Sequence, residues 1–318
     1  MQVLDRIDEE RIADLCARDE FFWLDVEAPT EEDIAGLAKR FSWHPLVVED
    51  LTHFEQRPKL ERYGDYMFIV FFGARPGEDG IPALTEVHLI VSGSYVITVR
   101  HSHCHQLADV HRRFAENPSK SEQFVVYRVL DALTDSFFPI LAQIDEQIDE
   151  LEDAIVRNPR NEELQRVSRV KRAVVELRRV VTPQRDLAAR TLDEIKDLPG
   201  LDADAKDYFR DLYDHLIRIS DLLDSYRDLL SGVMDIYLSV VSNRLNVVMK
   251  ELTIIATIFL PLTFVTGFFG QNFGWLVGHI STLWVFLVYG LGGLLVPIVL
   301  LVVYFRRRGY LSRAADGT

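Results

Sequence analysis

The sequence predicts an α/β cytoplasmic domain, a long helical stalk and two C-terminal transmembrane helices. Three observations lead to this fold class. Short β-rich runs and a capped helix fill the first 115 residues. From about Ser121 the apolar residues recur every third or fourth position, as on a helix. Residues 252–305 contain no Asp, Glu, Lys or Arg, which is long enough for two membrane spans.

Residues 1–120 are predicted to form the α/β domain. Ser92-Gly93-Ser94 separates two of its β-rich runs and is typical of a hairpin turn. Thr30, followed by three acidic residues, favours the start of a helix. The predicted strands are residues 21–26, 66–72, 86–91 and 95–100.

Residues 121–201 are predicted to form a helical hairpin region. An apolar stripe follows its first helix, in which Pro139 is expected to introduce a kink. A second helix is expected over about residues 161–197, with an interruption near Pro183. Pro199-Gly200 is expected to form the next turn.

Residues 202–270 are predicted to form one stalk helix that continues into the first membrane span, because no proline precedes Pro261. About 68 helical residues would extend roughly 100 Å. Such a helix can couple a cytoplasmic domain mechanically to a pore. The alternative is a coiled-coil stalk that only supports the domain.

The uncharged run divides into spans at about residues 252–269 and 282–305, with residues 271–281 as an external loop. The tail, residues 306–318, begins with three arginines, whereas the loop contains no basic residue. The positive-inside rule therefore predicts cytoplasmic termini for a lipid-embedded protein of the inner or plasma membrane.

Composition excludes several classes of function. The net charge of −14 argues against a nucleic-acid partner. Two cysteines are too few for a disulfide scaffold or a multi-cysteine metal cluster. The sequence also lacks a phosphate-binding P-loop, a Gly-x-Ser-x-Gly elbow and a His-Glu-x-x-His motif, so no enzymatic activity is expected.

A stripe of small and polar residues follows a seven-residue repeat along the stalk and the first span. Polar residues within a membrane face a bundle interior or a water-filled path. The alternative is close helix packing, which small residues permit. Two spans cannot enclose a pore, so a channel requires a homo-oligomeric ring. The stripe consists of Asp235, Ser239, Ser242, Asn246, Met249, Thr253, Ala256, Leu260, Thr263, Gly267 and Gly270.

The segment 263–273 resembles the membrane motif of the CorA family of divalent-cation transporters, with Gly270-Gln271-Asn272 in place of that family's Gly-Met-Asn. The resemblance covers nearly the whole chain. It includes Trp23-Leu24-Asp25, His44-Pro45-Leu46, Gln56-Arg57-Pro58-Lys59, Tyr208–His215 and Ser242-Asn243-Arg244-Leu245-Asn246.

The resemblance implies a funnel-shaped homopentamer that takes up Mg²⁺, and Co²⁺ with it. It implies that Asn272 forms an outer ring for hydrated cations and that Asp235 lies at the inner mouth. We expect Gln271, which departs from the family's motif, to support the loop. The remaining predicted pore-lining residues are Ser242, Asn246, Met249, Leu252, Ala256, Leu260, Thr263 and Gly267.

Two alternatives stay open. Gln271 and the acid-free external loop depart from the family pattern, so one alternative is a ZntB-like Zn²⁺ transporter, with or without coupling to protons. A protein of another class would be a membrane-anchored scaffold or sensor that conducts no ions. Such a scaffold needs no polar stripe along its first span.

The resemblance also implies regulation by cytoplasmic Mg²⁺ bound between subunits. Asp211 falls at one such ligand position, with Glu78 and Asp79 of a neighbouring copy as candidate partners. Bound Mg²⁺ would favour a closed pore, and like-charge repulsion would open it. The alternative for Asp211 is an ordinary surface carboxylate.

Overall fold

The computed structural model describes residues 1–77, 81–117, 122–194, 205–271, 274–279 and 282–310. The chain divides into two compact units, Met1–Tyr237 and Leu238–Thr318.

The first unit contains one mixed β-sheet with the strand order β1-β2-β6-β5-β4-β3. β1, β2 and β6 pair in parallel, whereas β3, β4, β5 and β6 pair antiparallel. All four predicted strands are present, and β5 and β6 form the predicted hairpin. The strands are β1 (Gln2–Leu4), β2 (Phe22–Glu27), β3 (Lys59–Tyr63), β4 (Tyr66–Arg75), β5 (Ala83–Ser92) and β6 (Tyr95–Arg100).

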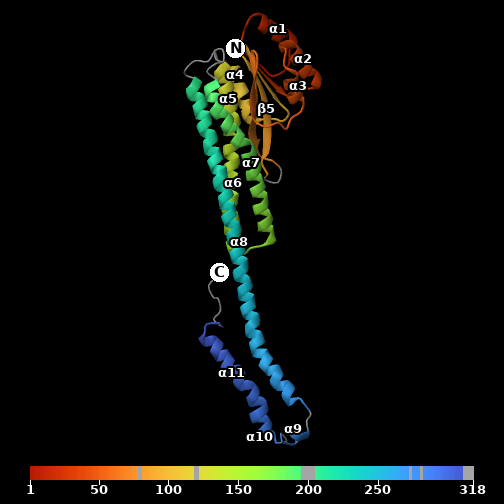
Figure 1. Cartoon of the computed structure of the whole chain (residues 1–318), viewed down its shortest axis with the longest axis vertical. Helices are drawn as coiled ribbons and strands as arrows, with labels where there is room; N and C mark the ends of the chain where they lie inside the picture. The colour runs from red at the N-terminus through yellow and green to blue at the C-terminus, as the bar shows by residue number, and fades with distance from the viewer. Residues whose placement is uncertain (78–80, 118–121, 195–204, 272–273, 280–281, 311–318) are drawn as a thin grey trace. The chain divides into compact units, whose positions relative to one another are not determined.

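Both faces of this sheet are buried. On β4, Phe68, Val70 and Phe72 belong to one hydrophobic core, whereas Met67 and Phe71 belong to the other. Alternate side chains of a strand point to opposite faces. Helices α1 (Glu9–Ala17), α2 (Glu31–Phe41) and α3 (Pro45–Thr52) pack into the first core, and α4 (His105–Glu116) and α5 (Glu122–Asp135) pack into the second (Figure 1).

Helix α2 starts where the sequence predicts. The Thr30 hydroxyl accepts a hydrogen bond from the Asp33 amide, and the Asp33 carboxylate accepts one from the Thr30 amide. This reciprocal capping box satisfies two amides that have no partner within the helix.

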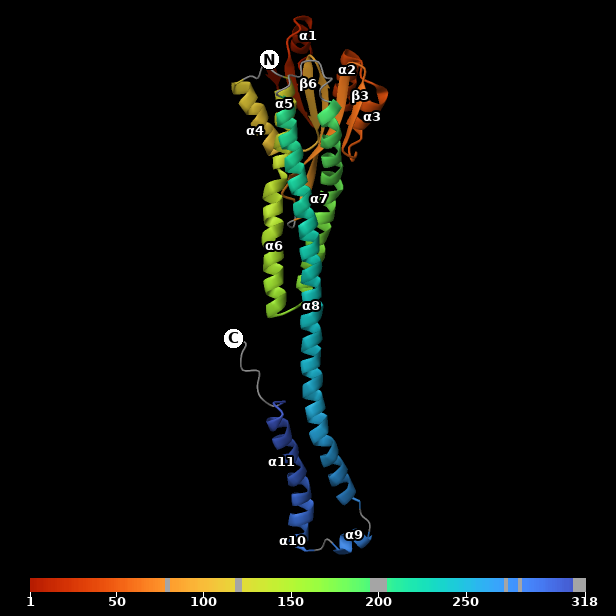
Figure 2. The same cartoon turned by 60° about the vertical axis from the view of Figure 1, so that its left-hand side comes forward.

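Helices α6 (Phe137–Arg157), α7 (Asn161–Glu194) and the first part of α8 (Ala205–Phe269) lie side by side and extend the first core (Figures 1 and 2). The helix is interrupted at Ser136, between α5 and α6, close to the kink expected at Pro139. Proline lacks an amide hydrogen and its ring clashes with the carbonyl four residues earlier, here that of Asp135.

The interruption expected near Pro183 is wrong, because α7 continues through this proline. The adjacent side chain holds the helix against the sheet. The Gln184 amide oxygen accepts a hydrogen bond from Phe72 N at 2.6 Å, and its nitrogen donates to Phe72 O at 3.4 Å. The turn expected at Pro199-Gly200 lies outside the described residues.

The second unit begins within α8, which is long and apolar enough to cross a membrane. The segment Leu283–Arg307 passes the same test and consists of α10 (Leu283–Val285), the π-helical η3 (Phe286–Leu291) and α11 (Gly292–Arg307). The stretch predicted as an external loop contains a short helix, α9 (Gly274–His279). The prediction missed α9 because the Gly- and polar-rich residues 270–274 led us to assign the whole stretch between the spans to a loop.

Candidate functional site

The structure places all nine predicted pore-lining residues on α8, in order along one helix. Asp235 belongs to the first unit and the other eight belong to the second. Every one of them is exposed in the isolated chain, including Met249 at 58% and Leu260 at 70%. The polar stripe is therefore a continuous uncovered surface of α8.

Another face of the same helical stretch is partly covered within the second unit. Ile254, Ile258, Pro261, Leu262 and Val265 are all half-buried. Their spacing of three and four residues defines one helix face. Since 100° separates successive residues, this face lies roughly opposite Ala256, Leu260 and Thr263. The unit thus shields one side of α8 and leaves the predicted ion path uncovered.

The hydroxyl groups of the span are satisfied by their own helix. Thr253 donates to Met249 O at 2.7 Å, and Thr257 donates to Thr253 O at 2.7 Å. Thr263 and Thr266 donate to carbonyls of the preceding turn in the same way. In a membrane each polar group needs such a partner, and a donating hydroxyl still offers oxygen lone pairs to water.

The C-terminal end of α8 is a tight turn. Gly270 N donates to Thr266 O at 2.9 Å, and Gln271 N donates to Phe268 O at 3.2 Å. A Cβ atom at Gly270 would lie 3.0 Å from Thr266 O, so a larger residue would crowd this turn. Gln271 is exposed, and Asn272 lies outside the described residues.

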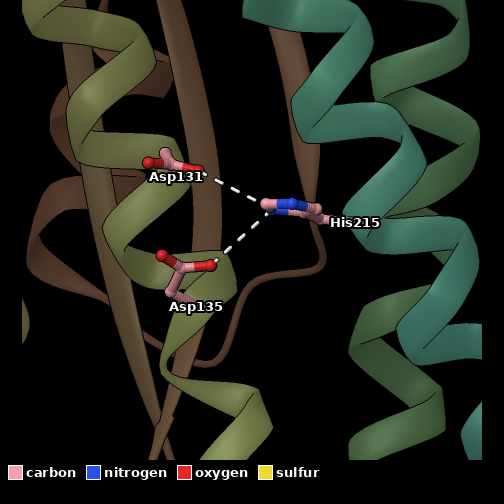
Figure 3. Close-up of side chains that lie close together, drawn as sticks. All are labelled: Asp131, Asp135 and His215. Carbon is pink, nitrogen blue, oxygen red and sulfur yellow. Dashed lines mark ion pairs between the residues drawn. The ribbon is translucent and has the colours of Figure 1, made fainter.

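A second group of candidate functional side chains lies where α5 packs beside α8 in the first unit (Figure 3). His215 Nδ1 is 3.8 Å from Asp131 Oδ1 and 3.7 Å from Asp135 Oδ1. His215 Nε2 is 3.9 Å from Asp211 Oδ1. We call Asp131, Asp135, Asp211 and His215 the acid–histidine cluster.

Burial and like charge make this cluster electrostatically costly. Asp131 is 5% exposed, and burial together with the Asp135 charge raises the pKa of its carboxyl group, although Arg128 at 2.8 Å opposes the shift. Tyr127 donates a hydrogen bond to Asp211 at 3.2 Å, and burial and the neighbouring carboxylates raise its pKa to about 12. Excess negative charge at this partly buried site favours a bound cation.

The cluster offers ligand atoms for a cation. Single ligand atoms of Asp131, Asp135 and His215 all lie within 4.8 Å of one another. His215 Nδ1 is buried and has no hydrogen-bond partner among the described residues. Carboxylate oxygens suit Mg²⁺, and an imidazole nitrogen suits Co²⁺ or Zn²⁺.

Sequence reasoning identified Asp211 but missed its three neighbours. The pairs Asp131/Asp135 and Asp211/His215 have i,i+4 spacing, which places each pair on one helix face. That spacing was the available signal, but it is common on solvated helices. Glu78 and Asp79, the expected partners of Asp211, lie outside the described residues.

Comparison with known proteins gives the same architecture. The model of the family described as "CorA-like Mg2+ transporter protein" matches residues 18–307. The cobalt/magnesium transport protein CorA of Thermotoga maritima is 35% identical over 91% of this chain and 83% of that protein. The zinc transport protein ZntB of Yersinia enterocolitica is 26% identical over 81% of this chain and 78% of that protein.

The solved structure of the CorA magnesium transporter from Methanocaldococcus jannaschii has the same fold. It superposes with a TM-score of 0.80 at 24% identity, covering 91% of each chain. This match confirms the predicted fold class of an α/β domain, a long stalk helix and two C-terminal spans. A family match over residues 18–307, a relative at 35% identity and the shared fold lead to one conclusion: the chain belongs to the CorA family, whose members are metal-ion transporters and not enzymes.

Proposed function

We propose that this chain forms a homopentameric channel of the inner or plasma membrane that takes up Mg²⁺, and Co²⁺ with it. The observation that carries the proposal is the uncovered stripe of small and polar residues on α8, which continues into a run of 54 residues that has no full charge. The Thermotoga maritima relative, named for cobalt and magnesium transport, supports the choice of ions. The proposed orientation keeps both termini in the cytoplasm, because the basic residues flank the spans on that side.

The proposed filter is Asn272 at the outer end of α8, next to the Gly270 turn. Mg²⁺ loses its water shell reluctantly. A ring of neutral amide oxygens can hydrogen-bond that water shell and still release the ion. Below the filter, Thr263, Ala256 and Asn246 continue the path toward the Asp235 ring. The membrane potential supplies about 2.3 kcal/mol per unit charge per 100 mV, doubled for a divalent ion.

The proposed gate is controlled by cytoplasmic Mg²⁺ at the acid–histidine cluster. Three carboxylates around one histidine repel one another unless a cation lies among them. A cation bound at Asp211, and completed by Glu78 and Asp79 of a neighbouring copy, would hold two copies together and favour the closed pore. Loss of the ion would restore the repulsion and shift the population toward the open pore.

Ion uptake into liposomes tests this proposal. The purified protein is compared with its Asn272→Ala variant for Mg²⁺, Co²⁺, Ni²⁺ and Zn²⁺, with and without a membrane potential. Potential-driven Mg²⁺ uptake that Asn272→Ala abolishes is expected. No uptake of any ion by correctly assembled protein would instead support a non-conducting scaffold.

A Zn²⁺ transporter coupled to protons is the second candidate. Three observations favour it: the ZntB relative, the amide of Gln271 in place of Met, and the absence of acids in residues 271–281. The same liposomes separate the two candidates when a pH gradient is imposed. Zn²⁺ uptake that follows the proton gradient, with little Mg²⁺ uptake, would favour the zinc transporter.

A further inference from the structure

The two ends of the uncharged run meet in the second unit. Helix α11 ends in a Schellman motif, in which Gly309 N donates to Arg306 O at 3.1 Å and Tyr310 N donates to Phe305 O at 2.9 Å. Gly309 has a φ of 73°, which glycine adopts without strain. The Phe305 and Tyr310 rings pack edge to face at 6.1 Å, as this motif favours.

This turn brings Tyr310 onto the other membrane helix. The Tyr310 ring lies 5.2 Å from Lys250 Nζ on α8, within cation–π range. Lys250 precedes the uncharged run by two residues, and Arg306 directly follows it. The contact therefore brings the residues that flank the two ends of the run next to each other.

Basic side chains gather at this level without matching acids. Lys250, Arg306, Arg307 and Arg308 are exposed, and within the described part of the chain no carboxylate forms an ion pair with any of them. Glu251 is the single acidic neighbour in sequence. Arg308 lies 5.8 Å from the Tyr304 ring, so aromatic rings flank the charges on both sides.

We propose that Lys250, Arg306, Arg307 and Arg308, the basic boundary cluster, bind the phosphodiester headgroup of an anionic phospholipid. A guanidinium group offers paired N–H donors to phosphate oxygens, and lysine adds a point charge. The apolar residues that begin directly beyond the cluster suit the acyl chains, and tyrosine rings suit the interface. A bound headgroup would bridge α8 and α11. The proposal depends on the membrane assignment of the two spans and holds whichever ion is transported.

Lipid binding to the purified full-length protein tests the proposal. Bound phosphatidylglycerol and phosphatidylcholine are counted by native mass spectrometry across a lipid titration. We expect preferential binding of phosphatidylglycerol. The triple variant Arg306→Gln, Arg307→Gln, Arg308→Gln should weaken it about fivefold per charge. The matched triple Arg157→Gln, Arg160→Gln, Arg166→Gln in the first unit should leave it unchanged.

A second pair of variants keeps every charge and so keeps membrane insertion. Tyr310→Leu removes the ring that holds Lys250, and we expect about threefold weaker phosphatidylglycerol binding. Tyr310→Phe retains a ring and should bind as the unmodified protein does. Equal binding of the two lipids, or unchanged binding in both Tyr310→Leu and the Arg306–Arg308 variant, would overturn the proposal. Displacement of the lipid by millimolar inorganic phosphate would also overturn it in favour of a general anion site.

Discussion

Asp211 and His215 occupy successive turns of α8, and the fold brings Asp131 and Asp135 to them from a helix about 80 residues earlier in the chain. Asp131 is the buried member of this group, and Asp211 and Asp135 are its exposed members. Asp131 therefore anchors the site against the buried interior of the first unit. Asp135 and Asp211 remain accessible to a cation and to a neighbouring copy.

Replacing Asp211 should uncouple transport from internal Mg²⁺. Asp211→Asn removes one anionic ligand while keeping the size of the side chain, so we expect about tenfold more internal Mg²⁺ for half-maximal inhibition of uptake. Asp207→Asn is the matched control, because Asp207 is one turn earlier on α8, is 81% exposed and pairs with Arg210. Equal Mg²⁺ inhibition of both variants would show that Asp211 is an ordinary surface carboxylate.

The raised pKa of Asp131 predicts a pH-dependent stability. The folded state binds this proton more tightly than the unfolded chain, whose carboxyl group has its ordinary pKa of 3.8. The stabilisation is therefore fully present below pH 3.8 and is lost as the pH rises through the folded-state pKa. Without divalent cations, Asp131→Asn should be more stable than the unmodified protein at pH 7.

Thermal unfolding in EDTA at pH 7 and near pH 4 measures this effect. The stability difference between Asp131→Asn and the unmodified protein should shrink toward pH 4. Added Mg²⁺ should then stabilise the unmodified protein more than the variant, because binding to the folded state alone raises its stability. A variant that is less stable at pH 7 would contradict this account of the cluster.

The sequence was sufficient to predict single-helix features of the site but not contacts between helices. The pore-lining residues could be proposed because they share one helix and nearly all of them follow a fixed repeat. Asp131 and Asp135 were missed because their role depends on which helix packs against α5, and no local pattern carries that information.

At the scale of elements, two prolines had different outcomes. Pro139 is the third residue of a new helix, where an amide hydrogen has no partner within the helix in any case. Pro183 lies inside α7, yet the helix continues because buried contacts and the Gln184 hydrogen bonds fix it against β4. The unpredicted strands β1 and β3 are edge strands, and β3 carries charged residues that obscure a strand pattern.

Gln184 is predicted to be a main link between α7 and the sheet. Its side chain is fully buried and pairs with both backbone groups of Phe72. Gln184→Ala should lower the free energy of unfolding by about 2 kcal/mol, because those groups would be left buried without partners. Gln165→Ala, at an exposed position of the same helix, should have little effect. Equal effects in denaturant titration would contradict the link.

At the scale of the whole molecule, the second unit exposes an unusual amount of apolar surface. Phe264, Trp284 and Leu260 are each at least 70% exposed in the single chain. Large contiguous apolar surfaces of this kind mark contacts with a membrane or with another protein. The sequence predicted both spans from the missing charges, but a single chain contains no information on how many copies surround the path.

The proposed assembly predicts a definite mass. Native mass spectrometry of the detergent-solubilised protein should give about five times the 36.6 kDa of one chain. A stable dimer or a monomer as the only species would contradict the proposed ring, since two spans per chain cannot then enclose a path.

The most direct test of the ion path compares two faces of α8. In a background without Cys16 and Cys104, single cysteines are placed at Ala256 on the uncovered stripe and at Ile258 on the half-buried face. Mg²⁺ uptake into liposomes is measured before and after treatment with a positively charged thiol reagent. Block of Ala256→Cys with continued uptake by Ile258→Cys is the predicted result. Block of Ile258→Cys alone, or equal sensitivity of both, would contradict the claim that the polar stripe of α8 lines the path of the ion.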